Sequence, residues 1–233
     1  MPSIISIIPA RGGSQGIKEK NLQLVDGKSL VQIAIEASNS CSSIKETYVS
    51  SDSEKILHLA RDLGADIHER SSTNASCTAS MLDTLKEFYS FYQSKKSLDD
   101  LWLLVLYPTY PFRTSEDLEK IIKTYLSKYK NFPHGIIGVK PTSDHPYLAV
   151  KCDNDIINPA YNPDVNLYYR RQKYPELWII CHWACLVPAK SLPYLNSQLF
   201  SEKTFPYRLE RSPIDIDTFD DLKYANFLAS SVK

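Results

Sequence analysis

Residues 3–21 read SIISIIPARGGSQGIKEKN, and this stretch decides the fold. The apolar run Ser3 to Ile8 is rich in β-branched residues, a pattern typical of a parallel strand that is covered on both faces. The loop that follows holds three of the seven glycines in the 233 residues: Gly12, Gly13 and Gly16. Glycine permits positive φ and lets backbone N–H groups come close to a ligand, so a glycine loop directly after a first strand suits phosphate oxygens.

Basic residues surround this loop, because Arg11, Lys18 and Lys20 add local positive charge to it. The loop matches neither the Walker A spacing nor the dinucleotide-binding glycine pattern. The simpler alternative is a tight turn with solvated lysines. The clustering of scarce glycines after the first strand favours an anion-binding loop.

Strands and helices alternate along the first half of the chain. Apolar runs predict strands at Glu46 to Ser51, Asp66 to His68 and Leu101 to Leu106. Helical spacing of apolar residues predicts helices at Leu30 to Ala37, Ser53 to Leu63 and Ala79 to Tyr92. This order indicates an α/β fold with a mostly parallel sheet and right-handed crossovers.

The second half is organised differently. A helix at Ser115 to Tyr129 and a strand at Gly135 to Val139 precede residues 141–174, which are rich in Pro, Asn, Asp and Tyr and predict an inserted β-ribbon with loops. Its tyrosines favour an interface, and a flexible substrate lid is the alternative. The core resumes with Leu177 to Val187 and closes with Ile214 to Leu228, so we assign residues 1–140 and 177–233 to a core and 141–176 to an inserted arm.

Composition excludes several classes of protein. Lys+Arg 27 balance Asp+Glu 27, which is unfavourable for binding a polyanion, so we expect no nucleic-acid partner. No run approaches the ~18 to 20 apolar residues of a membrane span, and the first residues lack a signal-peptide pattern, so we expect a cytoplasmic protein without a membrane partner. The five cysteines form no CxxC pair, and Cys181-His182-x-x-Cys185 is typical of a buried strand rather than a metal site.

A pair of carboxylates stands near the carboxyl terminus, in Ile214-Asp215-Ile216-Asp217. The period of two places both isoleucines on one face of an extended segment and both carboxylates on the other. Mg²⁺ typically takes one or two carboxylates and fills its other positions with water and phosphate oxygens. Asp217 also fits the N-cap of a helix over Thr218 to Leu228, and the two roles are compatible.

The stretch Ile8 to Asn21 resembles the opening signature of the acylneuraminate cytidylyltransferases, also called CMP-sialic acid synthetases. Further matches to that family follow in order along essentially the whole chain: Val49-Ser50-Ser51-Asp52-Ser53, Gly64-Ala65, Glu69-Arg70, Thr78-Ala79-Ser80, Pro108-Thr109-x-Pro111-Phe112-Arg113, Arg171-Gln172-x-x-Pro175 and Ile214-Asp215-Ile216-Asp217. The resemblance implies a Rossmann-like nucleotidyltransferase sheet. It also implies a homodimer in which an inserted dimerisation arm, here residues 141–176, is exchanged between subunits.

By the same resemblance, the anomeric hydroxyl of a keto-sugar acid attacks the α-phosphorus of CTP with the help of Mg²⁺, and pyrophosphate leaves. Arg11, Lys20, Asp215 and Asp217 would be catalytic, and Asp215 and Asp217 would hold the metal. The residues that would bind the nucleotide are Arg11, Gly12, Gly13, Ser14, Gly16, Lys20, Asn21, Arg70 and Ser80. The acceptor sugar would contact Arg171, Gln172 and Tyr107.

Four of the motif residues also have structural alternatives. Arg70 could be an exposed partner of Glu69, and the Ser80 hydroxyl could bond a helix backbone. For Arg113, which precedes two helix-capping residues, the structural role is favoured. Arg171 suits a bidentate pair with the carboxylate of a sugar acid, and a basic surface run is its alternative.

The chain departs from the family pattern around the expected sugar pocket. Tyrosines at 107 and 110 stand where the family usually has Gln and Ser, Ile180 to Cys185 replaces an Asn-Gly-Ala-Ile-Tyr run, and Cys77 replaces an Asp. We therefore expect sialic acid or a related nonulosonic acid as the acceptor. The alternatives are a nucleotidyltransferase for another sugar or a sugar phosphate, with GTP among its candidate donors, and a nucleotide-binding module without acceptor activity.

Overall fold

The computed structural model describes residues 2–13, 16–75, 79–96, 100–142, 144–161, 164 and 166–231, with the side chains of all of these except Ser72, Ala75 and Arg171. Its main sheet has the strand order β11-β7-β10-β6-β1-β4-β5. Neighbouring strands pair in parallel, except that β10 runs antiparallel between β6 and β7. The strands are β1 (Ser3–Pro9), β4 (Glu46–Ser51), β5 (Asp66–Glu69), β6 (Leu101–Val105), β7 (Ile136–Pro141), β10 (Trp178–Pro188) and β11 (Phe205–Arg208). The predicted mostly parallel α/β sheet is confirmed.

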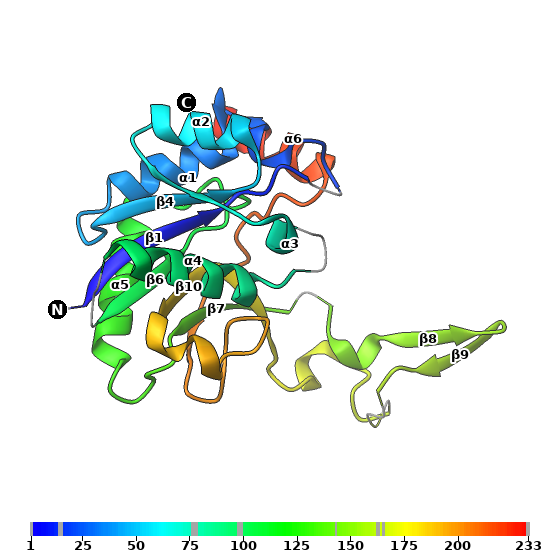
Figure 1. The fold of residues 1–233 in the computed structure, drawn as a ribbon. Helices are drawn as coiled ribbons and strands as arrows, with labels where there is room; N and C mark the ends of the chain where they lie inside the picture. Colours follow the sequence, from blue (N-terminus) through cyan, green and yellow to red (C-terminus); the bar gives the residue numbers. More distant parts are fainter. Residues whose placement is uncertain are drawn as a thin grey trace.

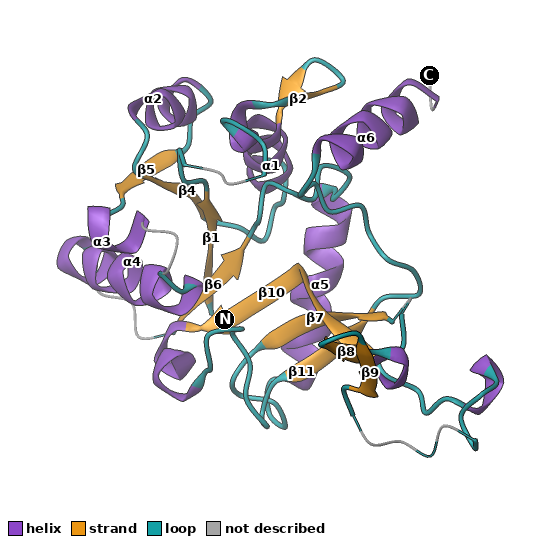
Figure 2. Cartoon of the chain, turned by 90° about the vertical axis from the view of Figure 1, so that its right-hand side faces the viewer, coloured by secondary structure: helices purple, strands orange, loops and turns teal. Residues whose placement is uncertain are grey.

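Helices cover both faces of the sheet, as Figure 2 shows. Apolar residues of α1 (Leu30–Asn39), α2 (Glu54–Asp62) and α5 (Ser115–Lys128) share one core cluster with one face. Apolar residues of α4 (Met81–Lys95) and of the short 3₁₀ helix Ala189–Tyr194 form a second core cluster with the opposite face of the sheet. Strand β1 is buried along its whole length because both clusters cover it, as the continuous apolar run predicts.

A third, smaller apolar cluster lies under α6 (Phe219–Ser231). It joins Ile17, which follows the glycine loop, to Ile216, which stands between the two predicted metal ligands. Val25 belongs to it too, from the hairpin of β2 (Leu24–Val25) and β3 (Lys28–Ser29). Apolar packing therefore brings the beginning and the end of the chain to the same place.

The observed elements differ from the sequence predictions in a few respects. The prediction did not include β2, β3, β11 or α3 (Ser72–Ala75), all of which are too short to show a period. The predicted N-cap role of Asp217 is wrong. Thr218 takes that place, because its hydroxyl accepts the Asp221 N–H at 3.3 Å while the Asp221 carboxylate accepts the Thr218 N–H at 2.7 Å.

Residues between β7 and β10 project from the sheet (Figure 1). They include the hairpin of β8 (Val150–Asp153) and β9 (Ile156–Pro159) and short 3₁₀ helices at Pro146–Leu148 and Arg171–Lys173. All residues of β8 and β9 are exposed. The ribbon expected in this region is present. Its role as a dimerisation arm, and the division of the chain at 140 and 177, stay predictions. No helix within the described ranges is long and apolar enough to cross a bilayer.

Candidate active site

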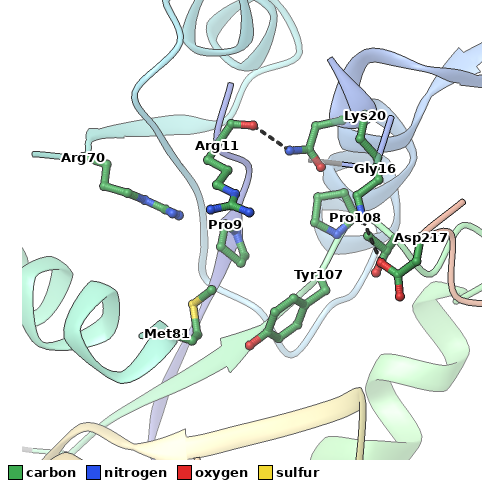
Figure 3. A pocket seen from close by; sticks show the side chains of 11 residues that line it. Pro9, Arg11, Gly16, Lys20, Arg70, Met81, Tyr107, Pro108 and Asp217 are labelled. Atoms are coloured by element: carbon green, nitrogen blue, oxygen red, sulfur yellow. Dashed lines mark hydrogen bonds and ion pairs between the residues drawn. The ribbon is translucent and has the colours of Figure 1, made fainter. Parts of the chain in front are cut away.

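A cavity of about 380 Å³ lies where β1, β5 and β6 reach their carboxyl ends. This edge of a parallel sheet is where α/β folds commonly bind ligands. Many of the residues singled out in the sequence line the cavity, among them Asn21. Figure 3 shows the others from close by: Arg11, Gly16, Lys20, Arg70, Tyr107 and Asp217. Residues from the beginning, middle and end of the chain thus form one site.

Three cations meet in this cavity. The side chains of Arg11 and Arg70 point into the same space, and Lys20 lies beside Asp217 (Figure 3). Asp217 is the only carboxylate among the described residues that line it. The excess of positive charge in a chain of zero net charge makes the cavity suited to a polyanionic ligand of small size.

Close approach explains the glycines at positions 12 and 16 of the loop. Neither Gly12 nor Gly13 has a positive φ. A Cβ on Gly16 would lie 2.6 Å from the backbone oxygen of Asp217, so only glycine lets the loop pack against the carboxylate segment. At Gly12 a Cβ would lie 3.0 Å from the Ser53 Cβ. The backbone N–H of Gly12 donates to the Asp52 carboxylate at 2.8 Å.

The short 3₁₀ helix Lys20–Leu22 carries the last residues of the loop motif. Asn21 is buried and its side-chain amide donates to the Arg11 carbonyl at 2.9 Å, which fixes the loop where the Arg11 side chain leaves it. Lys20 donates to the Asp217 carboxylate at 2.8 Å. Asn21 therefore shapes the loop while it lines the cavity.

The carboxylate segment is held as its alternation predicts. Ile216 is completely buried and Ile214 packs partly against the same cluster, which confirms that the isoleucines anchor the segment. The Ile216 N–H also donates to the Thr109 carbonyl at 2.9 Å, which ties the segment to the loop after β6. Asp217 lines the cavity, whereas Asp215 is half-buried outside its lining.

Asp215 faces a group of residues next to the cavity. The pKa of Tyr110 is raised by burial and then by the neighbouring charge of Asp215. Burial lowers the pKa of the His182 imidazole, and the negative charge of Asp215 acts in the opposite direction. Within the described residues, no three metal-ligating side chains gather. Two carboxylates alone fit Mg²⁺, which takes its remaining ligands from water and phosphate.

Some predicted site residues lie elsewhere or outside the description. Ser14 and Cys77 lie outside the described residues, as does the side chain of Arg171. Gln172 is exposed in the projecting region and does not line the cavity. Neither Gly12 nor Gly13 lines it directly.

Two predicted alternatives are decided by the hydrogen bonds. Ser80 is the N-cap of α4 and accepts the Asp83 N–H at 3.1 Å, which is the structural role foreseen for it. Arg113 is buried and donates to the carbonyls of Trp183 and Tyr107 at 2.8 and 3.2 Å, which confirms its structural role. Arg70 is also buried, so the alternative of an exposed partner of Glu69 is wrong.

Sequence reasoning missed His182 as a member of the site. The register of β10 against β7 shifts between Cys181 and Cys185, and this bulge carries His182 to the Tyr107 ring, with centroids 5.1 Å apart. Gly138 faces the bulge, where a Cβ would collide with the Cys181 carbonyl. A lone glycine in a predicted strand is a signal for such a bulge. Cys181 and Cys185 are buried, as expected for a strand.

The sequence compares clearly with one protein family. Residues 5–218 match a family described as cytidylyltransferase. The chain belongs to this cytidylyltransferase family. The match covers the glycine loop, the strands around the cavity and both carboxylates, so the resemblance stated from the motifs is confirmed, and the protein is a nucleotidyltransferase by family.

Curated relatives are similar over most of this chain. A CMP-N,N'-diacetyllegionaminic acid synthase from Legionella pneumophila subsp. pneumophila is 28% identical over 221 residues, which cover 92% of this cytidylyltransferase and 91% of the relative. An N-acylneuraminate cytidylyltransferase from Escherichia coli O18:K1:H7 is 33% identical over 95% of this chain but only 51% of its own length. The chain thus spans about half the length of the latter relative.

Solved structures share the fold at low identity. A CMP:2-keto-3-deoxy-manno-octonic acid synthetase complexed with CTP superimposes with a TM-score of 0.67 and 14% identity over 99% of this chain and 100% of the other. A 4-diphosphocytidyl-2C-methyl-D-erythritol synthase from Anaerococcus prevotii gives 0.64 with 17% identity over 98% and 96%. This cytidylyltransferase therefore has the same fold as these two enzymes.

Proposed function

We propose that this cytidylyltransferase couples CTP to a keto-sugar acid of the nonulosonic class, giving the CMP-sugar and pyrophosphate with the help of Mg²⁺. The observation that carries the proposal is the convergence of Arg11, Lys20 and Arg70 on one cavity that Asp217 also lines. Such a set suits a triphosphate together with a divalent cation. The names of the similar synthetases support the substrates.

The residues of the site divide between the two substrates. Arg11, Lys20 and Arg70 neutralise the phosphates, and the loop with Gly12, Gly13, Ser14 and Gly16 brings backbone N–H groups to them. Mg²⁺ held by Asp215 and Asp217 would offset charge on phosphate oxygens and favour ionisation of the attacking hydroxyl. The protein's own contribution is to hold the anomeric hydroxyl and the α-phosphorus in reach of each other.

Tyr107 and His182 form the wall on which we place the acceptor. The Tyr107 ring lines the cavity and contacts the imidazole, and both lie near the charge of Asp215. Tyr107 stands where the family usually has Gln, and His182 lies in the run that replaces Asn-Gly-Ala-Ile-Tyr, so this wall of two rings suits an acceptor with an apolar substituent. The similarity to a legionaminic acid synthase and to N-acylneuraminate cytidylyltransferases supports an acceptor of the nonulosonic class.

The arm supports a homodimer. Val150, Ile156 and Ile157 are 51%, 60% and 70% exposed on the β8–β9 hairpin, and isolated two-stranded hairpins are at best marginally stable. Exposed apolar side chains of this kind mark protein interfaces. A second copy of the chain would cover them and could place Arg171 and Gln172 against its partner's acceptor. Since CTP is an intracellular nucleotide, we also infer a cytoplasmic enzyme.

One assay tests the function. Pyrophosphate release is measured for each of the four nucleoside triphosphates combined with a panel of keto-sugar acids and sugar phosphates. We expect release with CTP and a nonulosonic acid. Pyrophosphate release only with GTP and a sugar phosphate would contradict the proposal and indicate a nucleotidyltransferase for sugar phosphates. CTP binding without pyrophosphate release from any pair would indicate a nucleotide-binding module without acceptor activity.

Sedimentation of the full chain tests the dimer. We expect a dimer, and replacement of Ile156 and Ile157 by Ser should shift the protein to monomer without unfolding the core, since both side chains are exposed. A wild-type chain that sediments as a monomer at all concentrations would contradict the dimer.

A further inference from the structure

Behind Arg70 lies a buried polar pair that the proposed reaction does not use directly. Ser50 of β4 and His68 of β5 stand opposite each other in the parallel ladder. The Ser50 hydroxyl lies 2.9 Å from His68 Nδ1, and the Arg70 guanidinium donates to the same hydroxyl from Nε at 3.3 Å. All three side chains are buried. The hydroxyl therefore connects an imidazole to a cation of the cavity.

The donors and acceptors fix one direction in this chain of hydrogen bonds. Arg70 can only donate, so the Ser50 oxygen accepts from it. We assign the hydroxyl proton to the bond with His68 Nδ1, which places the ring proton on Nε2. Burial lowers the pKa of His68, and the charges of Arg70 and Lys95 act in the same sense against the opposing charge of Glu87.

Aromatic rings surround the imidazole. The ring of His68 meets Phe91 at a centroid distance of 4.8 Å and Phe88 at 5.4 Å, both from α4. Arg70 makes a second bond, from Nη2 to the Ser50 carbonyl at 3.1 Å. No hydrogen bond within the described parts of the chain engages its Nη1. Ser50 thus holds one side of the guanidinium, and the side chain extends into the cavity (Figure 3).

We propose that His68 is a positioning residue that acts through Ser50 to aim the Arg70 guanidinium at the phosphates of the nucleotide. The inference rests on the proposed function, because it assumes that the cavity takes a nucleoside triphosphate. With its proton directed to His68, the Ser50 hydroxyl keeps its lone pairs for Arg70. Without that acceptor the proton can turn to other acceptors, and the guanidinium loses part of its preorganised orientation.

A double-mutant cycle on CTP binding tests this inference. The dissociation constant of CTP is measured by calorimetry for the full-length chain without acceptor sugar. We expect His68→Leu to weaken binding about fivefold, as for the loss of one hydrogen bond, and to have no further effect in an Arg70→Ala background. His68→Asn, which keeps an acceptor near the position of Nδ1, should restore most of the affinity.

Control variants separate positioning from folding. Phe91→Leu disturbs the packing of the same imidazole but leaves the hydrogen bonds, so it should lower the melting temperature without changing CTP affinity. If His68→Leu lowers CTP affinity equally in the wild-type and Arg70→Ala backgrounds, or lowers it in neither, the inference is overturned. A wild-type chain that fails to bind CTP would instead refute the proposed function, so the two failures are distinguishable.

Discussion

The Lys20 ammonium lies 2.8 Å from the Asp217 carboxylate, and this ion pair joins residues 197 positions apart. Asp217 keeps 71% of its side chain exposed, whereas Lys20 keeps 18%. An ion pair with one carboxylate so exposed contributes little to stability. In the proposed reaction its two members therefore exchange partners, Lys20 turning to phosphate and Asp217 to metal.

Asp217→Asn should lower turnover by about 100-fold, because the amide is a poor ligand for Mg²⁺ and leaves phosphate charge uncompensated. Asp215→Asn should act in the same direction. Pyrophosphate release at several Mg²⁺ concentrations measures the effect, and CTP affinity in a chelator should stay close to wild type. Asp220→Asn is the matched control, since Asp220 pairs with Lys223 on the exposed side of α6 and does not line the cavity. Near-wild-type turnover of Asp215→Asn and Asp217→Asn at low Mg²⁺ would contradict the metal assignment.

Lys20→Met should raise the KM for CTP about tenfold, because a charge-assisted contact to phosphate is lost. Lys18→Met is the comparison, since Lys18 is exposed and does not line the cavity. Steady-state kinetics of both variants at saturating acceptor measure the difference. Equal KM values for the two variants would show that the general charge of the loop, and not Lys20, holds the nucleotide.

Gly16→Ala should destabilise the protein by about 1 to 3 kcal/mol, as overpacking does, because the new methyl group meets the Asp217 backbone oxygen at 2.6 Å. Gly13→Ala provides the contrast, since a Cβ at that position would meet no atom of the described residues within 4 Å. Urea unfolding measures both. If the two variants are equally stable, the loop does not pack on the carboxylate segment in solution.

Glu119→Gln should lower the free energy of unfolding at neutral pH by about 1 to 2 kcal/mol. Glu119 of α5 accepts hydrogen bonds from Ser42 at 2.9 Å and from the Ser43 N–H and hydroxyl at 2.8 and 2.6 Å. Hydrogen bonds from Ser43 lower the pKa of this carboxyl from 4.5 to about 2. Its contribution is complete above pH 4.5 and is lost as the pH falls towards 2.

The pH dependence of unfolding therefore tests whether Glu119 stabilises the protein through its charge or through packing. The difference between wild type and Glu119→Gln should shrink across that acidic range. Glu116→Gln, at an exposed position on the same helix, should have a much smaller effect at every pH. A difference that stays constant down to pH 2 would show that Glu119 acts through packing and not through its charge.

Local patterns made much of the fold and part of the site predictable. The continuous apolar run of β1 and the alternation in Ile214 to Asp217 each report burial directly, so the strand and the anchored carboxylates follow from sequence. The positive charge around the first loop, from Arg11 and Lys20, was expected from the residues, whereas Arg70 was assigned to the same site only by the family resemblance.

Features that depend on register could not be predicted. Ser50 meets His68 only because β4 and β5 pair with these two residues opposite each other, and no single-strand pattern carries that information. His182 reaches Tyr107 through a bulge of β10. The reason for glycine at position 16 was missed because the colliding atom belongs to the other end of the chain.

The root of the arm has a consequence for how this protein can change. Pro141, where β7 ends, pairs with Trp178, where β10 begins, so the chain leaves and re-enters the sheet at a single rung of one ladder. The segment between those two residues can therefore change in length without moving the end of either strand. Insertions, deletions and wholesale exchange of the segment are thus open to evolution, and the assembly and acceptor contacts proposed for it can diverge while the cavity stays the same.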